Sequence, residues 1–171
     1  MAEETRLDID QYIDGDEDTL EGLHLTFSLG KEEYGVEIRY VTEIIGIQKI
    51  TDLPDTPEYL KGVINLRGKV IPVIDMNIRF NLGERDYDER TCIIHVNIRG
   101  TSVGLIVDTV SEVIEIAKDH VEEPPSVSAG NSNRYISGLG RVGDSVKILL
   151  NLEQLLFEDE LQAISDLGDA G

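Results

Sequence analysis

The sequence feature that most restricts the fold is an internal repeat. Nine positions between residues 25 and 45 have side chains of the same type as nine later positions. One constant offset along the chain relates the two sets, and it takes Leu25 to Ile94. The first set is Leu25, Phe27, Leu29, Gly35, Ile38, Val41, Glu43, Ile44 and Ile45, and the second is Ile94, Val96, Ile98, Gly104, Val107, Val110, Glu112, Val113 and Ile114. Seven further positions from Tyr59 to Met76 match those from Tyr135 to Leu152 at a second, larger offset. The pattern predicts two related units of about seventy residues each, with a longer loop within residues 122–134.

Each unit has the pattern of an all-β structure. Residues 23–29 alternate apolar and polar side chains, as a half-buried strand does, and residues 91–98 repeat that strand. Because a small sheet exposes its edges unless it closes, we predict two SH3-like five-stranded β-barrels. Neither barrel would bury a large core alone, so they should pack on a shared apolar interface. Short helices are expected at residues 76–80 and in the C-terminal segment, where Leu152, Leu155, Leu156, Ala163 and Ile164 are near helical spacing.

The segment from Tyr59 to Asp75 is predicted to be a β-hairpin. Its apolar residues are mostly β-branched and are bounded by glycines, which favours strands over a helix. The tip carries Asn65, Arg67 and Gly68. A single arginine on a neutral turn is a poor catalyst but a good contact for a partner's carboxylate.

The charge of the chain is strongly negative and uneven. The formal net charge is −19; residues 1–22 contribute −8 and residues 153–171 contribute −6, which leaves −5 for the body. Proteins that bind nucleic acid or anionic lipid have the opposite sign, so neither partner is expected. Residues 1–22 are predicted to be a disordered acidic leader, with docking on a basic partner as the open alternative. Residues 161–171 are expected to form an acidic C-terminal tail.

The sequence favours a cytoplasmic protein. The first residues, MAEETRLDID, have no basic start and no apolar run, so they are not a signal peptide. No apolar run approaches the roughly 20 residues of a membrane helix, so no membrane insertion is expected. Cys92 is the only cysteine, which rules out an intrachain disulfide.

Nothing in the sequence favours an enzyme. Cys92 and His95 are three residues apart on one predicted strand and should point to opposite faces, which argues against a nucleophile–base pair. The three histidines have no zinc-ligand spacing. Residues 138–143 spell GxGxxG, but a strand-like segment follows, so a hairpin turn is predicted there. We therefore predict no catalytic residue, no cofactor and no metal.

Residues 59–75, YLKGVINLRGKVIPVID, resemble the signature of the CheW family of bacterial chemotaxis coupling proteins. Residues 30–45, 103–113 and 135–156 match the same family in the same order, so the resemblance covers about residues 23–160. It implies two five-stranded β-barrels, with halves at about residues 23–90 and 91–152 that intertwine at their ends. It also implies a non-enzymatic scaffold that couples methyl-accepting chemoreceptors to the histidine kinase CheA. The expected partners are the regulatory domain of CheA and the cytoplasmic tip of the receptors, in membrane-associated arrays.

The resemblance further implies that Arg67, Glu43, Val41 and Gly62 bind partners. Structural alternatives stay open for each. Arg67 is equally consistent with a turn arginine that pairs within the fold, and an internal Glu43–Arg67 pair would orient it toward a partner. Val41 taken alone would be interpreted as a core residue, and Gly62 as a glycine of a tight bend.

Two other functions remain as alternatives. One is a small β-barrel enzyme or ligand carrier, which a deep polar pocket with convergent titratable groups would favour. The other is a coupling protein of a non-flagellar chemosensory system, which the sequence does not separate from the first hypothesis.

Overall fold

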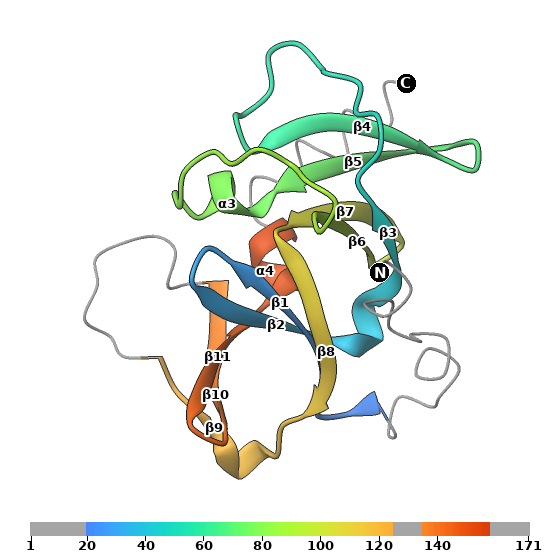
Figure 1. The fold of residues 1–171 in the computed structure, drawn as a ribbon. Helices are drawn as coiled ribbons and strands as arrows, with labels where there is room; N and C mark the ends of the chain where they lie inside the picture. Colours follow the sequence, from blue (N-terminus) through green and yellow to red (C-terminus); the bar gives the residue numbers. More distant parts are fainter. Residues whose placement is uncertain (1–19, 125–134, 158–171) are drawn as a thin grey trace.

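The chain forms two β-sheets, and short helical segments lie between some of the strands (Figure 1). The computed structural model describes residues 20–124 and 135–157, and all structural statements below concern these residues. Most of the predicted leader, most of the predicted loop 122–134, the tail 161–171 and the predicted helical positions Ala163 and Ile164 lie outside the described residues. The strands are β1 (Leu23–Leu29), β2 (Glu32–Glu37), β3 (Val41–Gly46), β4 (Leu60–Leu66), β5 (Lys69–Asp75), β6 (Cys92–Ile98), β7 (Thr101–Val107), β8 (Thr109–Glu115), β9 (Val121–Glu122), β10 (Ile136–Val142) and β11 (Ser145–Leu150).

The helical segments are all short. They are the 3-10 turns η2 (Ile38–Tyr40) and η3 (Lys118–His120) and the α-helices α3 (Met76–Arg79) and α4 (Leu152–Phe157). The side chain of Asp75 caps α3 by accepting a hydrogen bond from the Ile78 amide at 3.2 Å. Helices α3 and α4 follow β5 and β11, so they occupy equivalent places in the two repeats. No helix of the described residues is long and apolar enough to cross a membrane.

Each sheet contains strands of both repeats. Sheet A has the order β8-β1-β2-β11-β10-β9, and sheet B has the order β3-β6-β7-β5-β4. The hairpin β1–β2 of the first repeat therefore lies in sheet A with strands of the second, and β6–β7 of the second lies in sheet B. Parallel pairing joins the repeats: β2 runs beside β11, and β5 runs beside β7. Because of this exchange, neither repeat holds a complete sheet by itself.

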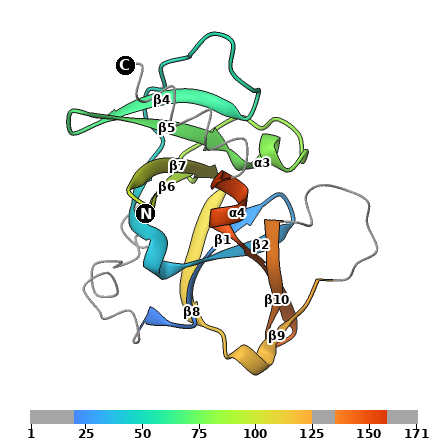
Figure 2. The same cartoon turned by 180° about the vertical axis from the view of Figure 1, so that it is seen from behind.

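The predicted all-β class with short helices is confirmed. Sheet B has the predicted five strands, and sheet A has one more because the short β9 pairs with β10. The sheets curl, as both views show, but strand pairing among the described residues leaves each one open (Figures 1 and 2). The edges are β8 and β9 in sheet A and β3 and β4 in sheet B.

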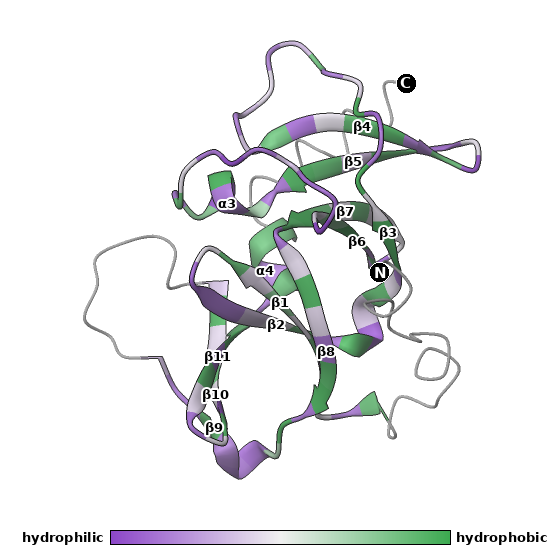
Figure 3. Cartoon of the chain, viewed as in Figure 1, coloured by the Kyte–Doolittle hydropathy of each residue, from purple (hydrophilic) through white to green (hydrophobic). Residues whose placement is uncertain are grey.

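The main core lies between the two sheets. Leu25 and Phe27 of β1 pack in one buried cluster with Ile94 and Val96 of β6, which are the equivalent positions of the second repeat. The leucines of α4, including Leu155, join this cluster. A second, smaller cluster fills the inside of sheet B. Strands β6 and β7 are buried on both faces, and their sequences are therefore nearly continuous apolar runs, as Figure 3 shows.

Candidate functional site: an arginine turn at the edge of sheet B

The turn between β4 and β5 holds its arginine in an unusual backbone conformation. Leu66 and Lys69 are paired across the strands, so Arg67 and Gly68 form a two-residue turn. Both have positive φ, 52° and 87°, as a type I′ turn requires. The side chain of Asn65 accepts a hydrogen bond from the Gly68 amide at 2.8 Å. The turn therefore fixes the backbone that carries Arg67, while the side chain of Arg67 stays 69% exposed.

Arg67 pairs with Glu43 across the gap between β3 and β4, the two edge strands of sheet B. We call this gap the open seam. Glu43 lies on β3, at one edge of the sheet, and Arg67 follows β4, at the other edge. Arg67 Nη2 donates a hydrogen bond to Glu43 Oε2. A single β-bridge between Thr51 and Val63 crosses the same seam further along. The hypothesised internal Glu43–Arg67 pair is thus present, and it links the two edges that strand pairing leaves apart.

His95 is the third member of the site. It is the cross-strand neighbour of Glu43 in the β3–β6 pair, and its Nδ1 lies 3.2 Å from Glu43 Oε2. The residue is 7% exposed, and its Nε2 has no hydrogen-bond partner among the described residues. The same oxygen of Glu43 therefore contacts both the imidazole and the guanidinium. His95 supports the Glu43 carboxylate from inside the sheet while Arg67 covers it from the surface.

The electrostatics of the pair suit binding and not proton transfer. The hydrogen bond from Arg67 lowers the pKa of Glu43 and outweighs the opposing effect of burial, and the contact with His95 lowers this pKa further. The same hydrogen bond raises the pKa of Arg67. A carboxylate with a lowered pKa is a weak base, and a guanidinium does not release its proton. What the site offers is a fixed, exposed cation.

Val41 and Gly62 occupy supporting positions. Val41 begins β3 two residues before Glu43, is 3% exposed and belongs to the main core. Gly62 has φ 146°, and a Cβ on it would lie 2.0 Å from the carbonyl oxygen of Thr51. Only glycine fits there, because the backbone of Thr51 runs directly beside β4 and pairs with Val63. Arg67 and Glu43 are brought together, whereas Val41 and Gly62 shape the strands that carry them.

Sequence patterns do not identify His95 as part of this site, since they relate it only to Cys92 on the same strand. Its cross-strand position opposite Glu43 depends on the β3–β6 register, which no local pattern gives. Cys92 is on the other face of β6, as predicted, and its Sγ donates to the Arg90 carbonyl at 3.3 Å. Burial raises the pKa of the Cys92 thiol, which disfavours the reactive thiolate.

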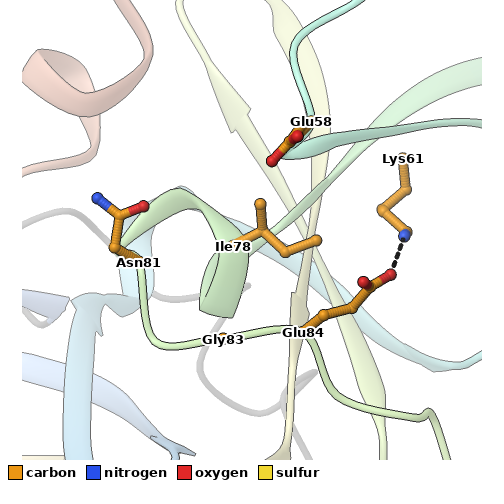
Figure 4. Close-up of a pocket in the computed structure, with 6 residues that line it drawn as sticks. All are labelled: Glu58, Lys61, Ile78, Asn81, Gly83 and Glu84. Carbon is orange, nitrogen blue, oxygen red and sulfur yellow. Dashed lines mark ion pairs between the residues drawn. The ribbon is translucent and has the colours of Figure 1, made fainter.

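A cavity lies elsewhere, beside α3 (Figure 4). It measures about 520 Å³ and is lined by Glu58, Lys61, Ile78, Asn81, Gly83 and Glu84. Lys61 pairs with Glu84 at 3.6 Å, but the side chain of Glu84 is 77% exposed. Such an open wall does not exclude water, so the cavity lacks the enclosure of a typical active site. Within residues 20–124 and 135–157, no cluster of three or more His, Cys, Asp or Glu could hold a metal.

Comparisons with known proteins identify the family. The family model of the CheW-like domain matches residues 23–160. The chain is 36% identical to chemotaxis protein CheW of Klebsiella aerogenes over 84% of this chain and 86% of that protein, and 34% identical to chemotaxis protein CheW of Treponema pallidum over the same shares. The crystal structure of the scaffolding protein TtCheW from Thermoanaerobacter tengcongensis has 40% sequence identity and a TM-score of 0.73, and the match covers 81% of this chain and 90% of that one. This chain belongs to the CheW family.

Proposed function

We propose that the protein is a non-enzymatic adaptor that couples methyl-accepting chemoreceptors to the histidine kinase CheA in chemotaxis signal transduction. The observation that carries this proposal is the Arg67 turn. An arginine held at positive φ on a fixed hairpin, oriented by a carboxylate and largely exposed, has the form of a contact for an acidic partner. Strained backbone at an exposed side chain points to a function that outweighs its cost in stability.

The proposed partners are the regulatory domain of CheA and the cytoplasmic tip of the receptors. Membership of the CheW family supports both, and the relatives are named as chemotaxis and scaffolding proteins. The adaptor would act in the cytoplasm and be recruited to membrane-associated receptor arrays. We propose that neither nucleic acid nor direct membrane insertion is involved, in line with the net charge of −19.

The four candidate residues are given different roles in this proposal. Arg67 and Glu43 contact the partner, because the side chain of Arg67 is 69% exposed and that of Glu43 is 26% exposed. Val41 and Gly62 act through the backbone they position, since Val41 is buried and Gly62 has no side chain. A conservative change at either would alter binding by moving β3 or β4.

A co-precipitation experiment tests the proposal directly. The full chain is immobilised and offered the regulatory domain of a CheA kinase and a receptor-tip fragment, each at concentrations well above micromolar. Retention of either partner, reduced by Arg67→Glu, is the expected result. If neither is retained, the adaptor function fails, because scaffold contacts of ordinary size are detectable at these concentrations.

A further inference from the structure

The Asn-x-Arg-Gly pattern of the β4–β5 turn occurs a second time in the chain. Residues 65–68 are Asn-Leu-Arg-Gly, and residues 97–100 are Asn-Ile-Arg-Gly. The second copy is the two-residue turn between β6 and β7, where Arg99 and Gly100 have φ 52° and 83°. Asn97 Oδ1 accepts a hydrogen bond from the Gly100 amide at 3.1 Å, as Asn65 does for Gly68. Two hairpins thus present an arginine at the same position of the same type of turn.

Arginine is not the residue that such a turn favours. Type I′ turns prefer asparagine, aspartate or glycine where Arg67 and Arg99 stand, because these residues tolerate positive φ. Among the described residues, the other non-glycine positions with positive φ are Asp55 and Asn81, which fit that preference. The two arginines are the exceptions. The recurrence of this outlier in the same form on two hairpins points to a role for the exposed guanidinium.

The two turns lie side by side at one end of sheet B. Strands β5 and β7 are adjacent and parallel, with Val73 beside Gly104, so both leave their turns at the same end. Lys69, the first residue of β5, donates from Nζ to Ser102 Oγ at 3.1 Å, which ties the start of β5 to the start of β7. In the order β6-β7-β5-β4 the centres of the two hairpins are two strand spacings apart, about 10 Å, where β5 and β7 pair from Val73 to Asp75.

Three cationic side chains lie at this end of the sheet. Arg67, Lys69 and Arg99 form what we call the twin-turn surface. Arg67 pairs with Glu43, and Arg99 Nε lies 3.4 Å from Oε1 of Glu153 on α4. Arg67 and Arg99 are thus each oriented by a carboxylate of this chain, and Lys69 is the third cation of the two turns. The side chains of Arg67 and Arg99 are 69% and 63% exposed, so both reach solvent.

We propose that the twin-turn surface is one docking site, in which Arg99 is a second anchor beside Arg67, and that its occupant is an acidic helix of the partner protein. The spacing supports this choice: residues i and i+7 of a helix lie on one face and are about 10 Å apart along the axis, which equals two strand spacings of a sheet. Two carboxylates so placed would each meet one guanidinium. This inference rests on the proposed function, since it assumes that Arg67 contacts the partner.

Binding titrations with a receptor-tip fragment test the second anchor. Arg99→Glu should weaken binding at least about tenfold, as expected for a desolvated anchor. Arg99→Asn should weaken it several-fold while the thermal midpoint stays the same or rises, because asparagine is favoured at positive φ. The loss should diminish at high salt, since charge pairs are screened there.

Arg141→Glu is the matched control. Arg141 lies on β10 of sheet A, is 55% exposed and pairs with Glu122 at 3.8 Å, so the variant makes the same change of charge away from the twin-turn surface. Its binding should stay within about twofold of wild type. If Arg67→Glu weakens binding but Arg99→Glu behaves like Arg141→Glu, the twin-turn surface is wrong and the proposed function stands. If neither arginine matters, both the site of the proposed function and this inference fail.

Discussion

Glu43 and Arg67 lie on opposite edges of one sheet and are joined by a hydrogen bond across its open seam. The bond has two consequences. It helps to hold the edges of sheet B together, and it orients an exposed guanidinium that the turn has already placed. Because exposed ion pairs stabilise folds only slightly, the second consequence is the more important one.

The N-terminal boundary of the folded body can be located by truncation. Leu20 packs against the main core, and the Gly22 carbonyl accepts a hydrogen bond from the Ile116 amide at 2.9 Å. Removal of residues 1–19 should leave the thermal midpoint nearly unchanged, because that segment has little apolar surface to offset its ordering entropy. Removal of residues 1–22 should lower the midpoint by several degrees. Equal thermal midpoints for the two truncated proteins would show that Leu20 and Gly22 contribute nothing to stability.

Gly62→Ala should be strongly destabilising. The new Cβ would overlap the Thr51 carbonyl oxygen, and φ 146° is unfavourable for alanine. We expect a loss of more than ~2 kcal/mol in the free energy of unfolding, measured by urea denaturation. Gly68→Ala is the control: its φ of 87° is also positive, but nothing lies within 4 Å of the added Cβ, so only the backbone strain remains, about 1 kcal/mol. Similar losses for both variants would contradict the close approach of Thr51 to β4.

Stability should fall in acid because of Glu43. The hydrogen bond from Arg67 lowers the pKa of the folded Glu43 carboxyl below its ordinary value of 4.5. The unfolded chain therefore takes up this proton first, and the stabilising effect is present above pH 4.5 and lost as the pH falls through the lowered pKa. Urea denaturation of wild type and Glu43→Gln should show a difference in free energy that shrinks on acidification. A difference that stays constant from pH 7 to pH 3 would rule out this linkage.

His24 should make the protein less stable at mildly acidic pH. Burial lowers its pKa below the ordinary value of 6.5, outweighing the hydrogen bond to the Gly22 carbonyl and the charge of Glu37. Below pH 6.5 the unfolded chain binds a proton that the folded chain does not, so stability falls with the pH until the lowered pKa is reached. The slope can reach about 1.4 kcal/mol per pH unit.

His24→Gln should flatten the pH profile of unfolding between pH 6.5 and the lowered pKa of His24. His120→Gln is the control, because it makes the same substitution at an exposed position. If the His24→Gln variant keeps the wild-type slope, another group is responsible for the pH dependence of the free energy of unfolding.

Local patterns in the sequence predicted most of the strands and turns. The offset that takes Leu25 to Ile94 correctly relates β1 to β6 and β2 to β7, and the one that takes Tyr59 to Tyr135 relates β4 to β10 and β5 to β11. The turn at Arg67 and Gly68 also follows from its local sequence, since glycine and alternating apolar residues flank it. These features depend on neighbouring residues and on the periodicity of the apolar side chains, and a single sequence contains both kinds of information.

The exchange of hairpins between the repeats could not be predicted in this way. A repeat shows which segments are alike, but β1–β2 would satisfy the same pattern in either sheet. The place of His95 beside Glu43 depends on the register of two strands that are far apart in the sequence. The second Asn-x-Arg-Gly turn does not follow from the repeat either, because the step from Asn65 to Asn97 fits neither offset. Only a search for identical turn sequences finds it.

A charge swap of Arg67 and Glu43 tests whether Arg67 is the partner contact. Titration calorimetry with the receptor-tip fragment and thermal unfolding are measured for wild type, Arg67→Glu, Glu43→Arg and the double variant. We predict that all four stay folded, that Arg67→Glu binds at least about thirtyfold more weakly, and that the double swap recovers part of the loss. Wild-type affinity in folded Arg67→Glu would contradict the assignment of Arg67 as the partner contact. An unfolded Arg67→Glu would instead show that the pair across the seam holds sheet B together.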